Sequence, residues 1–479
     1  MHARAAVSLR IVTEAVSDAV SKPILLELVV GPVAHGGWCV ARNPDDEGTG
    51  RVVFVRHALP GERVRARVTE ETKKFLRADA IEILEASPDR VEAPCPFSGP
   101  GRCGGCDWQH ASLPAQRKLK ASVVEEQLRR LAGIERSVLV EEIPVEQDFE
   151  LDGEPVIMPP GLGWRTRVQF AVRGDGAVGL RHHRGHSIEP VDQCLIAHPG
   201  VEMMGIERKR WPGASSVEGI ASASTGDRVV VLRERRGRDR RPVRVPRLDV
   251  PVRLVRGKPE PGSSLPYVRE EVAGRLWQVS GSGFWQVHPG AAQVLADAVL
   301  DALAPKPGEI AVDLYCGVGL FAGVIAERVG RDGLVIGVES DGLAVRDARF
   351  NLKDLPQVSI ERGNVEEILD QIEFGKSESA SGRSQAKRGD AAGHRGGARV
   401  RRADMVVLDP PRAGAGREVV DKIAALAGRK IAYVSCDPST LARDLGYFSE
   451  RGWTLESLRA FDAFPMTHHV ECLAVLTRG

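Results

Sequence analysis

The segment Ile431–Asp444, IAYVSCDPSTLARD, decides the fold of the C-terminal half of the chain. Its first four residues are apolar and predict a buried β-strand. The Asp-Pro pair at 437–438 ends this strand, and Ser439 or Thr440 can cap a helix that follows. In open α/β sheets the ligand crevice lies beyond the carboxyl ends of the strands. Cys436 therefore stands where a thiol could attack a bound molecule, although a buried, inert cysteine is the alternative.

Strand and helix patterns alternate upstream of this segment. Apolar strands are predicted in order along the chain, within 309–315, 334–340, 358–364 and 403–409. Helical patterns separate them, and such alternation predicts a parallel, doubly wound α/β sheet, here over residues 276–479. The segment 374–402 interrupts this domain with polar and basic low-complexity sequence. We expect that insert to be disordered, because it has almost no apolar residues from which to build a core.

A glycine turn follows the first of these strands. The motif D-x-x-C-G-x-G-x-F runs from Asp313 to Phe321, and its glycines allow the backbone to approach a ligand closely. Glu339 closes the next strand, where an acidic side chain can accept hydrogen bonds from ribose hydroxyls. The pattern predicts a nucleoside-containing cofactor. S-adenosylmethionine fits better than NAD, which would need a G-x-G-x-x-G loop and a second mononucleotide-binding half.

Two carboxylates complete the candidate site. Asp409 ends the fourth strand and could hold the cofactor or a substrate base, with a plain strand-ending turn as the alternative. Glu471 interrupts an otherwise apolar strand and is the candidate base, with a solvated edge-strand carboxylate as the alternative. A methyl donor, an acid and the Cys436 thiol together suggest methylation at C5 of uracil, which becomes nucleophilic only after a thiolate adds to C6. Because an ordinary thiol pKa is about 8.5, the site must stabilise the thiolate or remove its proton.

The N-terminal part has a different pattern. Residues 1–22 lack the long apolar core of a secretory signal, and we expect a loose extension there. Residues 23–86 contain short alternating strands separated by Gly and Pro, which predict a small closed β-barrel. A central region over 87–275 is rich in β patterns, and a helix with a 3.6-residue period is expected at 116–132, where it can pack on the catalytic domain.

Three cysteines lie close together in the central region. Cys95, Cys103 and Cys106 form C-x7-C-x2-C, and Cys194 is the best candidate for a fourth ligand. Zinc bound by four cysteines and an iron–sulfur cluster both satisfy this count. Zinc sites favour two paired C-x2-4-C motifs, whereas a distribution of three ligands plus one suits a cubane cluster better. Thiols without a metal are the third alternative.

Composition and charge narrow the class of partner. The chain carries 66 Lys and Arg against 65 Asp and Glu, so any nucleic-acid surface must be a local patch. The Arg- and His-rich sequence at 165–186 and the run RERRGRDRR at 233–241 are candidates, each with a solvated charged face as the alternative. No run of about 18 apolar residues exists, so we expect no membrane span and a cytoplasmic protein. Eight cysteines in such a chain favour metal or catalytic use over disulfides.

Four motifs occur together in this sequence. They are C-G-G-C-x-x-Q-H at 103–110, F-x-Q at 284–286, the D-x-x-C-G-x-G turn, and SCDPSTLARD at 435–444 with HVE at 469–471. In this combination the chain resembles the uracil-5-methyltransferases of structured RNA, in the subgroup with a TRAM domain and a 4Fe–4S cluster. The resemblance implies an OB-like TRAM β-barrel at 23–86, a central β-rich iron–sulfur domain, and a Rossmann-like class I methyltransferase domain.

The resemblance also implies roles for individual residues. Cys436 would be the nucleophile, and Glu471 the base that removes the C5 proton. The residues implied to contact S-adenosylmethionine are Gln286, Tyr315, Glu339, Asn364 and Asp409. Those implied to bind the cluster are Cys95, Cys103, Cys106 and Cys194, although C-x7-C is longer than the family's common C-x5-C. The implied substrate is RNA, with ribosomal RNA as the commoner target and transfer RNA as the alternative, and we expect a monomer.

Two other functions compete with this interpretation. A radical S-adenosylmethionine enzyme would carry C-x3-C-x2-C, which the sequence lacks. A non-catalytic RNA-binding or assembly factor could keep the same fold. The presence of both Cys436 and Glu471 argues against such a factor, because a binding protein needs neither a nucleophile nor a base.

Overall fold

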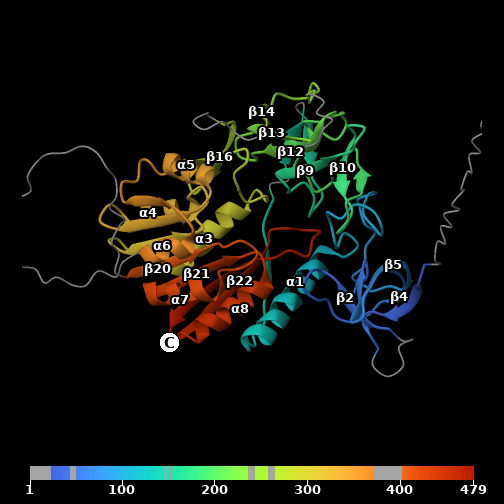
Figure 1. Ribbon diagram of the computed structural model, residues 1–479, viewed down its shortest axis with the longest axis horizontal. Coiled ribbons are helices and arrows are strands. Elements are labelled where there is room, and N and C mark those ends of the chain that lie inside the picture. Colours follow the sequence, from blue (N-terminus) through green and yellow to red (C-terminus); the bar gives the residue numbers. More distant parts are fainter. Residues whose placement is uncertain are drawn as a thin grey trace, which may run out of the picture.

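A barrel, a central β-rich part and an α/β domain follow one another along the chain (Figure 1). The computed structural model describes residues 23–43, 50–145, 148–151, 154–235, 243–256, 265–371 and 402–479. The expected N-terminal extension 1–22 lies outside the described residues, as does the expected disordered insert 374–402 except for its last residue. Within the described ranges, no helix is both long and apolar enough to cross a membrane.

The N-terminal sheet has the strand order β1-β4-β5-β3-β2. Its strands are β1 (Leu25–Val29), β2 (Cys39–Arg42), β3 (Val52–Arg56), β4 (Arg63–Glu71) and β5 (Phe75–Glu85). The chain after β1 returns to β2: the Gly31 N–H donates to the Val40 carbonyl at 2.7 Å, and the Val40 N–H donates to the Pro32 carbonyl at 2.9 Å. These bonds join the two outer strands, as expected for a barrel that leaves few open edges.

The central part is built on a sheet ordered β11-β10-β9-β12-β13-β14. Its strands are β9 (Arg167–Val172), β10 (Val178–Arg181), β11 (Ile188–Pro190), β12 (Ala214–Ala221), β13 (Arg228–Glu234) and β14 (Arg253–Arg256). The same region of the chain also contains the short helix α2 (Pro199–Glu202) and two hairpins, β7–β8 (Asp148–Leu151, Glu154–Ile157) and β15–β16 (Tyr267–Val272, Arg275–Ser280). Trp164, Phe170 and Trp211 are buried in the core of this part.

The C-terminal sheet has the order β19-β18-β17-β20-β21-β23-β22-β6. Its strands are β17 (Ile310–Leu314), β18 (Leu334–Glu339), β19 (Val358–Arg362), β20 (Ala403–Leu408), β21 (Ala427–Ser435), β22 (Trp453–Asp462), β23 (Glu471–Arg478) and the upstream β6 (Val140–Glu142). Strand β23 is antiparallel to both of its neighbours. The predicted doubly wound α/β fold is therefore confirmed, and β6 is an addition that its three residues could not have predicted.

Helices cover both faces of this sheet (Figure 1). They are α3 (Ala291–Leu303), α4 (Leu320–Val329), α5 (Gly342–Asn351), α6 (Val365–Gln371), α7 (Gly416–Leu426) and α8 (Pro438–Ser449). Neighbouring residues of one strand therefore enter different cores: Val406 belongs to the cluster that includes α7 and α8, whereas Val407 belongs to the cluster that includes α3 and α4. Burial on both faces explains why these strands are continuous apolar runs.

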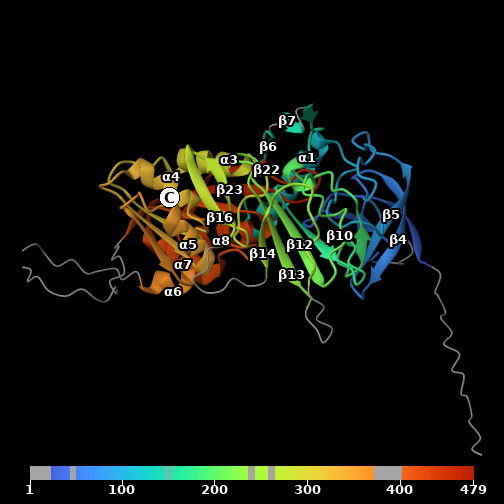
Figure 2. The same cartoon turned by 90° about the horizontal axis from the view of Figure 1, so that it is seen from above.

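The predicted helix 116–132 differs from the helix that forms. Helix α1 spans Leu113–Gln127 and continues as a π-helical turn over Leu128–Ala132. It begins earlier because Ser112 accepts a hydrogen bond from the Ala115 N–H, and proline stands within the first turn. Val124 and Leu128 share one apolar core with α8, so α1 packs on the α/β domain. Figure 2 shows α1 beside β22 from above.

The cap of α8 corrects another prediction. Neither Ser439 nor Thr440 caps this helix; Asp437 does, and its Oδ1 accepts hydrogen bonds from both of their N–H groups at 3.0 Å. Pro438 is thus the first helical residue, a position that needs no N–H donor. The cap follows Cys436 directly, so the turn that carries the thiol is fixed by the start of α8.

Candidate functional site

The predicted site residues lie at one edge of the C-terminal sheet. In the parallel register Leu314 pairs with Leu408, and Leu408 pairs with Tyr433. Tyr315 and Asp409 directly follow β17 and β20, and Cys436 directly follows β21. Parallel strands that end together bring the residues that follow them to the same crevice.

Cys436 and Glu471 meet through the antiparallel pair β21–β23. Ser435, the last residue of β21, pairs with Cys472. Cys436, which follows β21, therefore lies beside Glu471, the first residue of β23. Glu471 is only 3% exposed. Burial, and then the neighbouring charge of Asp409, raise the pKa of Glu471 well above its ordinary value. Burial, and then the charge of Glu471, raise the pKa of the Cys436 thiol to about 12.

The charges around this pair act in opposite directions. Burial raises the pKa of Asp409 to about 7. Arg412, from the Asp-Pro-Pro-Arg turn, opposes the rise in pKa of both Cys436 and Glu471. Its Nη2 lies 3.3 Å from Nε2 of His469, which directly precedes Val470 and Glu471. The site therefore combines a thiol, two carboxyl groups of raised pKa and one guanidinium.

A cavity of about 450 Å³ opens beside Cys436 and is formed by all three parts of the chain. The barrel contributes His35–Trp38, the central part contributes Gly104, Gly105, Asp107, His183 and Arg184, helix α1 contributes Val123, and the α/β domain contributes Arg412, Cys436–Pro438 and Thr467–Val470. The size is that of a small-molecule pocket, large enough for one extruded nucleotide. The sequence predicted the thiol but not the barrel and central walls around it.

Two hydrogen-bonded pairs hold these walls together. His35 Nε2 of the barrel lies 3.1 Å from Asp437 Oδ2, and His468 Nδ1 lies 2.6 Å from Asp107 Oδ2. Burial alone would raise the pKa of Asp437. Its hydrogen bonds with His35 and with the N–H groups of Ser439 and Thr440 instead lower that pKa to about 2. Asp107 and His468 stand next to the C-G-G-C and H-V-E motifs, a signal that could have suggested them; their pairing comes only from the fold.

Cationic side chains surround an indole in one wall of the cavity. The guanidinium carbons of Arg56, Arg77 and Arg184 lie 5.8, 5.6 and 5.7 Å from the ring centroid of Trp38. The ring of His183 meets the same indole edge-on at 5.5 Å. Trp38 and Arg56 are only 6% and 7% exposed, and Arg56 pairs with Asp107, so Arg184 is the exposed cation of this group.

The predicted cofactor residues surround the glycine turn. Gly317 N–H donates to Glu339 Oε2 at 3.1 Å, and Asp341 N–H donates to Glu339 Oε1 at 2.7 Å. Oε1 also accepts a hydrogen bond from Ser340 Oγ at 3.4 Å, so Oε2 is the carboxylate oxygen that keeps a lone pair for a ribose hydroxyl. Tyr315 has a φ of +63°, a conformation that turns the chain sharply out of β17. Asp313 is fully buried, and its Oδ1 has no hydrogen-bond partner within the described part of the chain.

The other two predicted cofactor residues are less enclosed. Gln286 is partly buried in the segment between β16 and α3. Asn364 is exposed, and its Oδ1 accepts a hydrogen bond from the Glu366 N–H at 3.0 Å at the start of α6. A structural role as helix cap therefore accounts for Asn364 without a ligand.

The four predicted cluster ligands line one small cavity of about 50 Å³. These are Cys95, Cys103, Cys106 and Cys194. Burial raises the pKa of Cys106 and Cys194, so their thiolates would be costly without a cation. Yet no three His, Cys, Asp or Glu side chains in the described ranges are arranged to hold a single metal ion. The four thiols therefore line one cavity without forming, among the described residues, a site for a single metal ion.

Comparisons with known proteins agree with this arrangement. Residues 272–479 match the family model of tRNA (uracil-5-)-methyltransferase, and residues 26–81 match the TRAM domain. The chain is 50% identical to an uncharacterized RNA methyltransferase of Streptomyces coelicolor, over 96% of each chain. It is 31% identical to the 23S rRNA (uracil(1939)-C(5))-methyltransferase RlmD of Alkalilimnicola ehrlichii, over 94% of this chain and 96% of that one.

A solved structure shares the overall fold. The chain superposes on Pyrococcus abyssi tRNA (uracil-54, C5)-methyltransferase in complex with S-adenosyl-L-homocysteine with a TM-score of 0.63. The superposition covers 94% of this chain and all of that one, at 21% identity. It supports the three-part architecture described above.

Alkylation should reveal the raised pKa of Cys436. At about pH 7 iodoacetamide should modify Cys436 more slowly than a free cysteine, because a pKa of about 12 leaves little thiolate. The rate should still be rising at about pH 10, beyond the ordinary thiol value of about 8.5. Mass spectrometry of the peptide that contains Cys436 follows the reaction, with Cys436→Ser as the control. An alkylation rate that levels off at about pH 8.5 would show that burial does not raise the pKa of Cys436.

Proposed function

The chain belongs to the RNA (uracil-5-)-methyltransferases, whose methyl donor is S-adenosylmethionine, and we propose that it forms 5-methyluridine through a covalent Cys436–uracil adduct. The observation that carries this proposal is the position of Cys436 in the wall of a nucleotide-sized cavity, beside Glu471. A uridine extruded from structured RNA would enter this cavity with its ring between the thiol and the methyl donor.

The first step is addition of Cys436 to the ring. The thiolate donates an electron pair to C6, and the C5–C6 π electrons move toward C5 and the O4 carbonyl as an enolate. The charge of Arg412 favours the thiolate, because it opposes the rise in the pKa of Cys436. The proton that leaves the thiol must go to water or to a neighbouring carboxylate.

The second step completes the methylation. When bound, S-adenosylmethionine would supply an electrophilic methyl group to C5 of the enolate, and the electron pair of the broken sulfur–methyl bond would leave with sulfur as S-adenosylhomocysteine. Glu471 then takes the C5 proton, the C5–H electron pair restores the C5–C6 double bond, and the C6–S pair returns to Cys436 as thiolate. A carboxylate whose pKa is raised by burial is a stronger base than one in water, which suits this proton transfer.

Residues around the glycine turn would hold the methyl donor. Glu339 is placed to accept hydrogen bonds from the ribose hydroxyls, and Tyr315 and Asp409 line the same edge of the sheet. Gln286 and Asn364 complete the proposed set, with Asn364 supported least because it already caps α6. Asp409 also interacts with Glu471, so it could orient the substrate base.

We propose ribosomal RNA as the target and a monomer as the working unit, in the cytoplasm. The RlmD relative, a 23S rRNA methyltransferase by name, aligns with nearly the whole chain, barrel and central part included. Transfer RNA is the alternative. Arg184, the exposed cation beside Trp38, would contact a phosphate of the strand that flanks the target, because such a contact does not depend on sequence.

We also propose that Cys95, Cys103, Cys106 and Cys194 hold a 4Fe–4S cluster. Its support is the shared cavity and the burial of two of the four thiols. Asp107 directly follows Cys106 and is bonded to His468, so the loop that would hold the cluster also contacts the wall of the nucleotide cavity. The proposed role is therefore to order this loop, and no step of the reaction passes through the cluster.

A mechanism-based substrate tests the covalent pathway. RNA that contains 5-fluorouridine should give an adduct with the protein that survives denaturation, because C5 then carries fluorine and no proton can be removed. Cys436→Ala should abolish the adduct. Glu471→Gln should slow turnover of ordinary RNA by about a hundredfold or more and should accumulate a methylated adduct. Active enzyme that gives no adduct would contradict the mechanism.

Mapping of 5-methyluridine identifies the target RNA. Total RNA from cells with and without this protein should differ at one or more uridines of 23S rRNA, and restoration of the wild-type chain should restore the modification. Cells that carry the Cys436→Ala chain separate a catalytic role from an assembly role. Loss of 5-methyluridine from transfer RNA alone would favour the alternative target.

The metal content of anaerobically purified protein tests the cluster. We expect iron and acid-labile sulfide in equal amounts and a broad visible absorbance, all lost in Cys106→Ser. Cys39→Ser is the matched control, because Cys39 is equally buried but lies in the barrel, away from the cysteine-lined cavity. Zinc without iron or sulfide would overturn the cluster in favour of the four-cysteine zinc site.

A further inference from the structure

The connection between β22 and β23, residues 463–470, lies directly before the proposed base. It forms no strand, yet Thr467–Val470 line the nucleotide cavity, and the next residue is Glu471. An irregular segment at a domain junction tends to be mobile unless other elements hold it. A base that must reach one proton needs such support, because displacement of about 1 Å can cost a hundredfold in rate.

Gln116 of helix α1 holds the middle of this connection. Its Oε1 accepts a hydrogen bond from the Met466 N–H at 2.7 Å, and its Nε2 lies 3.3 Å from Met466 Sδ. The same Nε2 donates to the carbonyls of Trp108 and Ala111 at 3.1 and 2.9 Å. Gln116 is fully buried, so every one of these bonds is made away from water.

Met466 has a backbone conformation that needs such support. Its φ is +67°, in the left-handed region that costs a side-chain-bearing residue about 1 kcal/mol or more. Besides the bonds from Gln116, its carbonyl accepts hydrogen bonds from the N–H groups of Asp107 and Trp108, both at 3.0 Å. Met466 is therefore fixed through its N–H, carbonyl and side chain at once.

Lys120, one helical turn after Gln116, holds the start of the connection. Its Nζ donates to Asp462 Oδ1 at 2.5 Å and to the Phe464 carbonyl at 3.0 Å. Lys120 and Asp462 are 0% and 2% exposed, and burial lowers the pKa of Lys120 despite its anionic partner. A buried ion pair contributes little net stability but can specify one arrangement of the chain.

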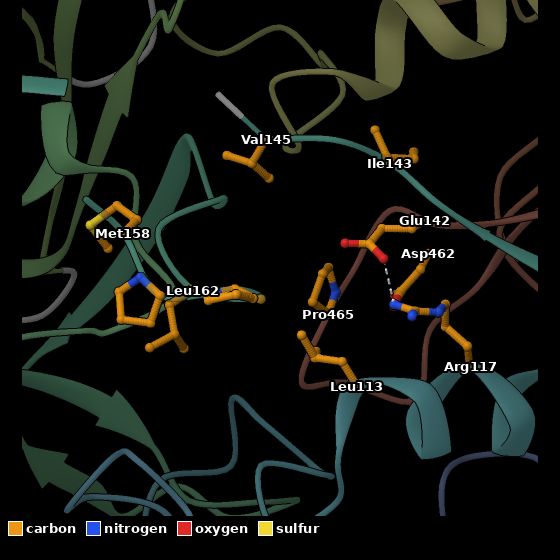
Figure 3. Close-up of a pocket in the computed structure, with 12 residues that line it drawn as sticks. Leu113, Arg117, Glu142, Ile143, Val145, Met158, Leu162, Asp462 and Pro465 are labelled. Carbon is orange, nitrogen blue, oxygen red and sulfur yellow. Dashed lines mark ion pairs between the residues drawn. The ribbon is translucent and has the colours of Figure 1, made fainter. Parts of the chain in front are cut away.

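Figure 3 shows the same junction from the side of a small adjoining cavity. Leu113 and Arg117 extend from α1, and Asp462, the last residue of β22, and Pro465, in the connection, lie across from them. Arg117 bonds instead to Glu142, the last residue of β6, with a nitrogen–oxygen distance of 3.1 Å. Successive positions of one helix thus serve different partners: Gln116 and Lys120 bind the connection, while Arg117 pairs with Glu142.

We propose that Gln116 and Lys120 are positioning residues that hold residues 463–470, and through them Glu471, in place for removal of the C5 proton. This inference rests on the proposed function. Cys436 does not share this support, because β21 and the Asp437 cap of α8 fix its turn. Loss of the α1 contacts should therefore spare addition of the thiolate and methyl transfer, and slow only proton removal with release of the thiol.

The first experiment compares two rates in Gln116→Leu. With 5-fluorouridine RNA, adduct formation needs Cys436 and the methyl donor but no proton removal, so its rate should stay within about twofold of wild type. With ordinary RNA, turnover should fall between about tenfold and about a hundredfold. A methylated protein–RNA adduct should accumulate, as it should in Glu471→Gln.

Two further variants separate positioning from stability. Arg117→Gln is the matched control from the same helix, and both rates should remain at the wild-type level. Lys120→Met combined with Asp462→Leu replaces the buried ion pair by apolar side chains, an exchange that often preserves or raises stability. This double variant should melt at or above the wild-type temperature yet accumulate the methylated adduct, because the bond to the Phe464 carbonyl is lost.

The outcomes are distinct. Parallel loss of adduct formation and turnover in Gln116→Leu, or wild-type turnover in both Gln116→Leu and the double variant, would overturn the positioning role. Slowed turnover without accumulated adduct would also overturn it, because proton removal would then not be the affected step. If wild-type protein gives no adduct with 5-fluorouridine RNA, the proposed function fails first.

Discussion

The constraint on which the site depends is the burial of Glu471 and the partial burial of Asp409 beside a thiol. Asp409 and Glu471 both have raised pKa values, and the charge of Glu471 adds to the effect of burial on Cys436. A raised pKa means that these two carboxyl groups and the thiol resist ionisation. In the proposed mechanism, the same burial would make Cys436 a strong nucleophile and Glu471 a strong base once each is ionised, as covalent activation of a uracil ring requires.

Three parts of the chain surround this buried centre, and each supplies a different kind of contact. The α/β domain provides the reacting groups, the barrel contributes Trp38 and the His35 bond to Asp437, and the central part brings Asp107 to His468. The cavity exists only where the three meet. Helix α1 packs on the α/β domain and bonds to the connection before Glu471. In the proposed mechanism, the packing of these parts therefore also sets the position of Glu471.

Much of the fold followed from local patterns. Apolar runs such as Val406–Leu408 indicated a parallel sheet, because a strand that is buried on both faces is apolar at every position. The glycine turn and Asp409 indicated that ligands bind at the carboxyl edge of this sheet. Errors arose where a local rule had competitors. Ser439 and Thr440 were plausible caps, but Asp437 also has a short side chain with an acceptor oxygen and stands directly before a proline, so it takes that role.

The sequence by itself determined which reactive groups are present: a thiol and an acid at strand ends, a glycine turn after the first strand of the domain, and four cysteines in a three-plus-one arrangement. Only the tertiary structure decided the pairings, such as Asp107 with His468 and Gln116 with Met466, which join residues more than 300 positions apart. The physical reason is that a hydrogen bond between distant segments leaves no periodicity in either of them. Patterns along the chain report which face is buried, whereas the partner across a junction depends on how separately folded parts pack.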